Sequence, residues 1–215
     1  MKKITIFLAM ICTLNFSVKA QDESSAVHKG TSLIDVYYGG PNLYGAIFKS
    51  LVESAAKSNN NNNGGITNVS GSGSGFIGGK YEYLLTDIFG IGVDFNYSTY
   101  TVKFQELTTD NNGTPVIYHY SYTTPAIRAM VGFNFHFVHA ANIDVYGAVK
   151  TGYYNRTTSF TSDQPGYNFT FTSLIPVAFR LETGMRYFFT PNVGVHANIG
   201  IGGGPIAVGG VSLKF

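Results

Sequence analysis

The sequence predicts an all-β protein, a closed eight-stranded antiparallel transmembrane β-barrel with a short helix in the first extracellular loop. Residues 193–202 alternate between apolar side chains and small or polar ones, and residues 206–215 do the same up to the terminal Phe215. A period of two places successive side chains on opposite faces of a strand. The alternation recurs in segments of about ten residues, which is the length of a tilted membrane-spanning strand.

An export signal at the N-terminus also indicates an envelope protein. Lys2 and Lys3 precede an apolar stretch, and a small-residue cleavage site ends at Ala20. The apolar stretch is well short of the roughly 20 residues that a membrane-spanning helix needs. We therefore divide the chain into a signal peptide at 1–20, a short N-terminal periplasmic segment at 21–30 and a transmembrane barrel domain at 31–215.

Removal of the signal changes the charge of the chain and takes away its one thiol. The chain has 14 Lys and Arg residues and 12 Asp and Glu residues. Loss of Lys2, Lys3 and Lys19 leaves 11 bases against those 12 acids, a net charge of −1. No basic cluster remains, which argues against nucleic-acid binding. Cys12 leaves with the signal, so we expect no disulfide, no thiolate metal ligand and no cofactor.

Eight strands follow in order from the period of two. Short connections alternate with longer, polar ones, as in barrels with short periplasmic turns and long outside loops, so both termini fall on the periplasmic side. An open sheet edge in hydrocarbon would leave unpaired backbone groups, so the sheet must close. The predicted strands are 31–39, 68–85, 90–104, 118–137, 143–160, 169–189, 193–202 and 206–215; the short connections are 86–89, 138–142 and 190–192; the long ones are 40–67, 105–117 and 161–168.

One face of each predicted strand is apolar and carries no charge, as contact with lipid requires. Aromatic residues gather at the strand ends, with Tyr83 and Tyr187 on the turn side and Tyr38 and Tyr97 on the loop side. Rings of this kind lie at bilayer interfaces, half in lipid and half in water. The pattern predicts two aromatic girdles.

The first long connection has a helical pattern. Its apolar residues repeat at spacings of three and four, and the Asn run at 59–63 ends the pattern. We expect a short helix that caps the barrel rim; a partner-binding or pore-covering element is the alternative. The apolar positions are Tyr44, Ile47, Phe48, Leu51, Val52 and Ala55.

The opposite face of the strands carries five acids and five bases. An eight-stranded barrel is just wide enough to be filled by side chains, so these groups must pair to offset the loss of water. We interpret them as a plug in which arginines pair with Glu82 or Glu182; a narrow channel whose selectivity they set is the alternative. His136 and His196 also point inward, as hydrogen-bonded fillers. The predicted lumen charge network is Asp35, Lys80, Glu82, Asp94, Arg128, Asp144, Lys150, Arg180, Glu182 and Arg186.

His119 and Ser121 are the candidates for an enzyme site. They share one face of a strand, so a base and a hydroxyl nucleophile could be neighbours, with Glu106 or Glu182 as the orienting carboxylate. This spacing looks like that in the barrel lipid A deacylases. The motif has no defined third member, and we expect no catalytic residue and no metal site in this chain.

These features resemble the small eight-stranded outer-membrane β-barrels, the OmpX-like and OmpA-transmembrane-domain-like group of the porin family. The resemblance rests on the signal, the alternation, Gly-rich strands such as 200–204 and the terminal residues Val211, Leu213 and Phe215. The terminal pattern resembles the signal read by the barrel-assembly machinery during insertion. The resemblance implies residence in the cell outer membrane of a Gram-negative envelope, in contact with outer-membrane lipid and lipopolysaccharide. The helical first loop departs from the protruding sheet of the OmpX-like barrels.

The sequence therefore predicts a monomeric, non-enzymatic outer-membrane protein with a structural or surface-interaction role and a lumen largely plugged by ion pairs. The alternative is a narrow porin-like channel for ions or small solutes, and the third hypothesis is a lipid A-modifying enzyme. The first two differ in the width of the lumen, which the strand pattern does not define.

Overall fold

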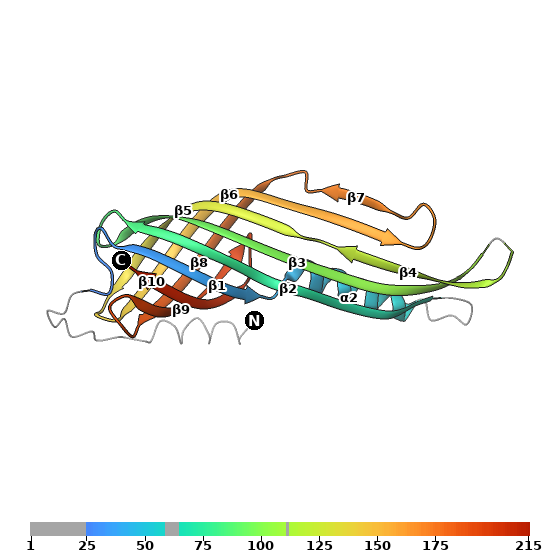
Figure 1. Cartoon of the computed structure of the whole chain (residues 1–215), viewed down its shortest axis with the longest axis horizontal. Helices are drawn as coiled ribbons and strands as arrows, with labels where there is room; N and C mark the ends of the chain where they lie inside the picture. The colour runs from blue at the N-terminus through green and yellow to red at the C-terminus, as the bar shows by residue number, and fades with distance from the viewer. Residues whose placement is uncertain (1–24, 59–64, 111) are drawn as a thin grey trace, which may run out of the picture.

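The computed structural model describes residues 25–58, 65–110 and 112–215. The predicted signal peptide and the Asn run at 59–63 lie outside the described residues. The described part contains one ten-stranded sheet and one helix (Figure 1). In chain order the elements are β1 (Ser32–Gly40), α2 (Leu43–Ser58), β2 (Gly65–Leu84), β3 (Phe89–Thr109), β4 (Pro115–Thr123), β5 (Ala126–His139), β6 (Ile143–Ser162), β7 (Phe169–Thr172), β8 (Val177–Phe188), β9 (Val193–Gly202) and β10 (Ala207–Lys214).

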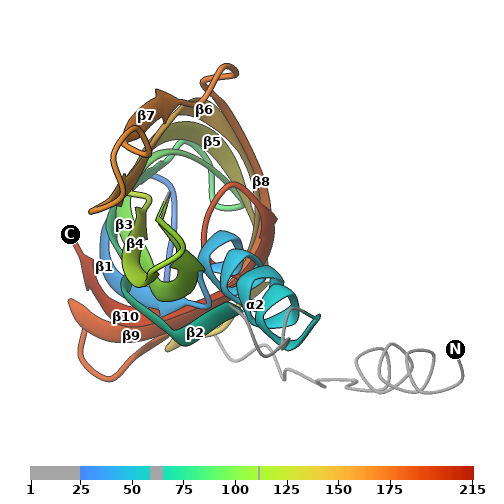
Figure 2. The same ribbon diagram turned by 90° about the vertical axis from the view of Figure 1, so that its right-hand side faces the viewer.

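Eight of these strands form an antiparallel ring. β1 pairs with β2 and with β10, and the pairing continues from β2 through β3, β5, β6, β8 and β9 back to β10. Every strand of the ring therefore has a partner on both sides, which satisfies the backbone groups that hydrocarbon cannot. Figure 2 looks along the ring from its loop end. The predicted all-β fold with an eight-stranded ring is confirmed.

The fourth and sixth predicted strands are each divided in two. β4 is separated from β5 at Pro125, and β7 is separated from β8 by a segment that ends at Pro176. Proline has no N–H to donate to a ladder, so a strand breaks there readily. The carbonyls of Pro125 and Pro176 still accept hydrogen bonds from the amides of Thr157 and Tyr154 of β6, at 3.2 and 3.0 Å. The chain therefore stays beside β6 across both interruptions.

A sheet protrudes from the loop end of the ring, and we call it the extension. It comprises residues 65–75 of β2, 99–109 of β3, 157–162 of β6, and all of β4 and β7. It forms the right-hand half of the molecule in Figure 1. The helical pattern of the first loop did not predict this sheet. The predicted connection at 105–117 is wrong as well, because β3 continues to Thr109 and β4 begins at Pro115.

The outside of the ring is an apolar belt. Val36, Val93 and Val131 are each more than half exposed, and the burial pattern of β8 alternates strictly along its whole length. Tyr38 and Tyr97 lie in one row, because both pair opposite Ile77. Apolar outward positions between rows of aromatic rings match the two interfaces of a bilayer. The outward faces predicted from the period of two are confirmed.

Helix α2 packs against the extension, and its first turn also borders the loop end of the ring, where the Tyr44 ring lies 4.1 Å from the Arg156 guanidinium carbon. Phe48 stacks on Tyr122 of β4, with ring centroids 3.9 Å apart. Gly45 and Val52 are buried on the same side of the helix, at spacings of three and four from Phe48. The predicted helix is confirmed, but Tyr44, Ile47 and Leu51 of its apolar stripe are exposed. Within the described residues, no helix has the length and apolar character needed to cross a membrane.

Residues 25–30 close the turn end of the ring. The Ala26 amide donates a hydrogen bond to the Ala140 carbonyl at 2.7 Å, and Lys214 Nζ donates to the Ala26 carbonyl at 2.7 Å. These bonds hold Ala26 and Val27 of the segment against three apolar side chains at the ends of the strands. We call this cluster the turn-end plug; it consists of Ala26, Val27, Leu33, Leu84 and Phe188, all at most 2% exposed.

Candidate functional site

The interior of the ring holds all ten predicted charged residues, and each of them is at most 7% exposed. Glycines on neighbouring inward positions make room for them. A Cβ at Gly184 would come within 2.7 Å of the Tyr146 ring, and a Cβ at Gly90 would collide with the Glu82 carboxylate. The inward glycines are therefore required by close packing around large polar side chains. The charges form two groups at successive levels.

The group nearer the turns, which we call the turn-side cluster, consists of Asp35, Glu82, His136, Asp144 and Arg186. Arg186 lies at its centre, and its Nη2 donates to Asp35 Oδ2 and to Glu82 Oε2, each at 2.9 Å. Its Nη1 donates to Asp144 Oδ2 at 2.8 Å. One guanidinium thus contacts three carboxylates that come from three different strands. A planar fork with five N–H donors is suited to this role, and an ammonium group is not.

His136 links two of the same carboxylates. Its Nδ1 lies 2.6 Å from Asp144 Oδ1, and its Nε2 lies 2.8 Å from Glu82 Oε1. A neutral imidazole has one nitrogen without a proton, which would face a carboxylate lone pair. Both contacts are satisfied when both nitrogens donate, so His136 is an imidazolium in this arrangement. The sequence placed it inward but did not identify it as a fifth base.

The second group, the loop-side cluster, consists of Lys80, Asp94, Lys150, Arg180 and Glu182. Glu182 accepts from Lys80 Nζ at 2.6 Å, Lys150 Nζ at 2.7 Å and Arg180 Nε at 2.6 Å. Lys150 also reaches Asp94 Oδ2 at 2.8 Å. One carboxylate is therefore shared by three bases, the inverse of the turn-side cluster.

Neutral side chains complete the hydrogen bonding of both clusters. Tyr37 Oη donates to Asp94 at 2.6 Å, and Asn198 Nδ2 donates to Glu182 at 2.9 Å. Ser212 Oγ donates to Asp35 at 2.6 Å, and His196 Nδ1 lies 3.0 Å from Ser212 Oγ. The strand pattern did not single out Tyr37, Asn198 and Ser212, although their inward parity on β1, β9 and β10 is a usable signal.

The charges of the two clusters cancel. The turn-side cluster has three carboxylates against Arg186 and the His136 imidazolium, and the loop-side cluster has two carboxylates against three bases. The first group is negative by one charge and the second is positive by one. Their sum is zero, which is the condition for keeping charges out of water without an external counter-ion.

Arg128 differs from the prediction. It is 3% exposed and inward, but within the described residues no carboxylate lies within 4.0 Å of it, and it pairs with neither Glu82 nor Glu182. Its guanidinium carbon instead lies 5.0 Å from the centroid of the Phe76 ring and 4.4 Å from that of Tyr154. His136, and not Arg128 as predicted, is therefore the fifth base that pairs with the five inward carboxylates.

The enzyme candidates lie on the extension. His119 is exposed, and its Nδ1 lies 2.9 Å from Asp163 Oδ2, while its amide donates to Asp163 Oδ1 at 2.8 Å. These two bonds hold the pKa of the Asp163 carboxyl below its ordinary value. The predicted orienting residues, Glu106 and Glu182, are wrong, because Glu182 is buried in the loop-side cluster and Asp163 takes the position beside His119. Ser121 lines the same polar hollow as His119, opposite Lys103 of β3.

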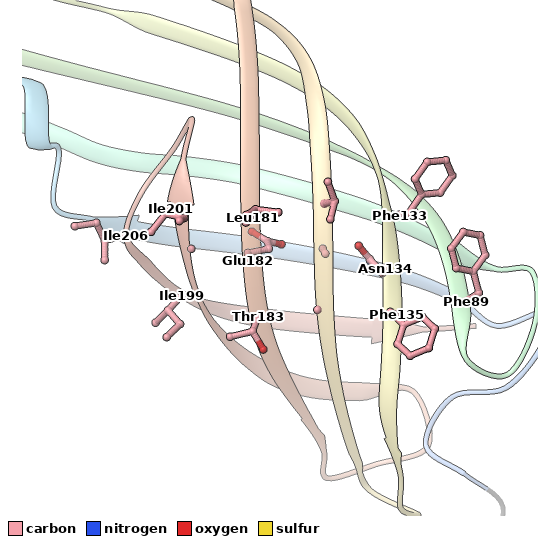
Figure 3. Close-up of a pocket in the computed structure, with 14 residues that line it drawn as sticks. Phe89, Phe133, Asn134, Phe135, Leu181, Glu182, Thr183, Ile199, Ile201 and Ile206 are labelled. Carbon is pink, nitrogen blue, oxygen red and sulfur yellow. The ribbon is translucent and has the colours of Figure 1, made fainter. Parts of the chain in front are cut away.

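A wide apolar groove runs over the lipid-facing side of β5, β6, β8 and β9 (Figure 3). Phe133, Phe135, Ile199 and Ile201 form its rim, and glycine or alanine backbone forms its floor at 147–148. Its volume is about 620 Å³. The groove belongs to the apolar belt.

The predicted assembly-signal residues lie at the edge of this belt. Phe215 is 68% exposed, and its amide and carbonyl both pair with Ser32 of β1. Val211 is exposed on the same outward face, and Leu213 is half-buried. Their function in insertion stays a prediction.

The ring, the belt and the filled interior define a small transmembrane β-barrel. No protein-family model and no curated protein matches the chain. Among solved structures it is similar to the N-terminal β-barrel domain of Pseudomonas aeruginosa OprF, with 13% identity over 88% of this chain and 100% of that one and a TM-score of 0.44.

Two further structures are similar at the same level. Ail, the attachment invasion locus protein of Yersinia pestis, has 14% identity over 87% of this chain and 99% of its own, with a TM-score of 0.41. The outer membrane protein OprG of Pseudomonas aeruginosa has 9% identity over 87% and 97%, also with a TM-score of 0.41. The fold assignment itself rests on the strand pairing described above.

The turn-side cluster gives a prediction about stability. Replacing Arg186 with alanine leaves three buried carboxylates without their shared partner, which should cost on the order of 3 to 5 kcal/mol of unfolding free energy. The lipid-facing neighbour Met185→Ala should cost far less, since its side chain is half exposed at the outer surface. Urea unfolding in detergent micelles measures both. Equal losses in the two variants would contradict a cluster centred on Arg186.

Proposed function

We propose that this protein is an integral outer-membrane β-barrel with a blocked lumen and a structural or surface-interaction role. The observation that carries the proposal is the ion-paired interior. The turn-end plug closes one end, and the two charge clusters fill the middle with side chains that bond to one another across the ring. Such a core supplies no continuous water path for a solute.

The extension is the part of the molecule best placed for contact with a partner outside the membrane. A ladder of rings crosses it from β3 to β7, with centroid spacings of 5.0 Å for Phe104 and Tyr120, 5.6 Å for Tyr120 and Phe160, and 5.1 Å for Phe160 and Phe169. The ladder continues to Phe171. Its inner members are shielded, whereas Phe169 and Phe171 are about half exposed. Exposed aromatic groups at the free end of a ladder are suited to a binding surface.

The same proposal includes the immediate surroundings of the barrel. The apolar belt and its groove would contact the acyl chains of outer-membrane lipid and lipopolysaccharide (Figure 3). The ring has no unpaired edge within the belt, so a monomer suffices for closure. Phe215, Leu213 and Val211 would serve as the signal for the barrel-assembly machinery.

Planar-bilayer recording tests the blocked lumen against the narrow channel. The reconstituted protein should give no stable conductance steps, because ten paired charged side chains occupy the interior. Regular steps whose ion selectivity changes in Lys150→Gln would contradict the proposal and favour a pore lined by the loop-side cluster.

The surface role predicts that the end of the ring ladder is dispensable for stability. Phe169→Ser should change the unfolding free energy by no more than about 0.5 kcal/mol, as is usual for exposed side chains. The buried member Tyr120, which is 5% exposed, is the matched control, and Tyr120→Ser should cost about 3 kcal/mol or more. If Phe169→Ser destabilises as much as the control, the ladder is a core and not a binding surface.

We propose no enzyme activity. The His119 and Asp163 pair supplies a base with an orienting carboxylate, but no hydrogen bond joins His119 to Ser121 among the described residues. A nucleophile needs its base within hydrogen-bond reach. The lipid A acylation pattern of cells should therefore be the same with wild type, His119→Ala or no protein. A change that requires both His119 and Ser121 would show that the protein is a deacylase.

A further inference from the structure

A cavity of about 590 Å³ opens at the loop end of the ring, above the charge clusters. It lies between α2, the parts of β5 and β6 at the loop end of the ring, the start of β8 and the turn between β9 and β10. Figure 2 views the molecule from this end, with α2 standing beside the strands. Most of the wall is apolar, including Ile47, Phe76, Ile175 and Ala178, and two arginines, Arg128 and Arg156, complete it.

Arg128 is held between two aromatic rings and has no carboxylate partner among the described residues. Phe76 and Tyr154 lie against the guanidinium at 5.0 and 4.4 Å, which fixes the position of the group. Nη1 donates one bond, to Asn96 Oδ1, at 3.3 Å. Nε is fully buried and has no hydrogen-bond partner. This buried donor is a cost of the placement, and it is not a group that a ligand in the cavity could reach.

Arg156 brings a second positive charge to the same wall. Its guanidinium carbon lies 4.1 Å from the centroid of the Tyr44 ring of α2 and 5.9 Å from that of Tyr154. Both arginines therefore contact Tyr154 from one cavity. The described residues that line the cavity include no Asp or Glu.

The charge balance of the interior makes this pair significant. The five inward carboxylates are already neutralised by Lys80, Lys150, Arg180, Arg186 and His136. The positive charge of Arg128 is thus not balanced by any inward carboxylate, and Arg156 adds a second positive charge beside it. A buried guanidinium with free N–H groups and no protein carboxylate is complementary to an anion, above all a carboxylate that can accept two parallel bonds.

We propose that the loop-end cavity binds a small organic acid, with its carboxylate on Arg128 and Arg156 and its aliphatic or aromatic body against the apolar wall. The cavity volume is in the range of sites for small organic molecules. This binding is additional to the blocked-lumen role and does not require passage through the ring.

The test uses 4-fluorobenzoate as the probe and ¹⁹F NMR as the readout, with the full barrel in phosphatidylcholine nanodiscs. We expect saturable binding of 4-fluorobenzoate. The neutral analogue 4-fluorobenzamide should bind at least about tenfold more weakly, because it lacks the charge that a charge-assisted hydrogen bond requires. Equal binding of the two probes would overturn the proposal.

Variants locate the site. Arg128→Gln and Arg156→Gln should each weaken 4-fluorobenzoate binding by roughly tenfold or more. The control Lys103→Gln removes the same charge from the exposed outer face of the extension and should leave the affinity unchanged. Arg128→Gln should not lower the urea midpoint below that of wild type, because Arg128 has no carboxylate to leave unpaired. If binding persists in both arginine variants, or falls equally in Lys103→Gln, the assignment is wrong.

The phosphate groups of lipids could also bind to the same arginines. A last experiment therefore separates a soluble acid from a lipid as the source of the anion. Adding phosphatidic acid to the nanodiscs should leave 4-fluorobenzoate binding unchanged if a soluble acid is the ligand. Displacement of the probe in proportion to the added lipid would overturn the proposal in favour of a lipid site.

Discussion

Charge balance between the two side-chain clusters inside the ring is the constraint on which the rest of this structure depends. Once eight strands pair on both sides, every inward side chain is cut off from lipid and largely from water, and a charge there is costly unless it is paired inside the ring. The chain meets this condition with two complementary arrangements, three carboxylates around Arg186 and three bases around Glu182. Each is off balance by one charge, and together they are neutral when His136 is an imidazolium.

This neutrality explains other features of the barrel. Glycines lie next to the largest inward side chains, because a ring of eight strands has no spare volume. The turn end can be sealed by apolar groups alone, since Arg186 and its partners need no access to water there. At the loop end the balance is complete before Arg128 is reached, so that residue is placed between aromatic rings and faces a cavity. The proposed blocked lumen and the proposed acid site thus both follow from one distribution of charge.

The sequence predicts this fold to the extent that the fold depends on local periodicity. Because the strand period is two, parity alone assigned Asp35, Lys150 and Arg186 to the interior and Val93 and Val131 to lipid. Closure followed from the environment and needed no contact information. The strand breaks at Pro125 and Pro176 also have a local signal, the prolines themselves. The alternation of apolar and polar residues continues on either side of each proline, so each pair of strands was predicted as one.

Partner choice could not be predicted, because it depends on register between distant segments. Asp35 and Arg186 are 151 residues apart and meet only after the ring has closed. His119 and Asp163 meet because β4 lies beside the end of β6, a pairing outside the ring that the helical first loop gave no reason to expect. For the same reason Arg128 was predicted to form ion pairs. Like Arg180 it lies at an inward position of its strand, but the side chains that surround it are aromatic.

The protonation of His136 is the most direct test of this account, because the charge balance of the two clusters depends on it. ¹⁵N NMR of the labelled protein in micelles at neutral pH distinguishes a protonated ring nitrogen from a bare one. The account predicts that both His136 nitrogens carry protons and that each is hydrogen-bonded to a carboxylate. A His136 ring with one unprotonated nitrogen would contradict it, since the five inward carboxylates would then lack their fifth base.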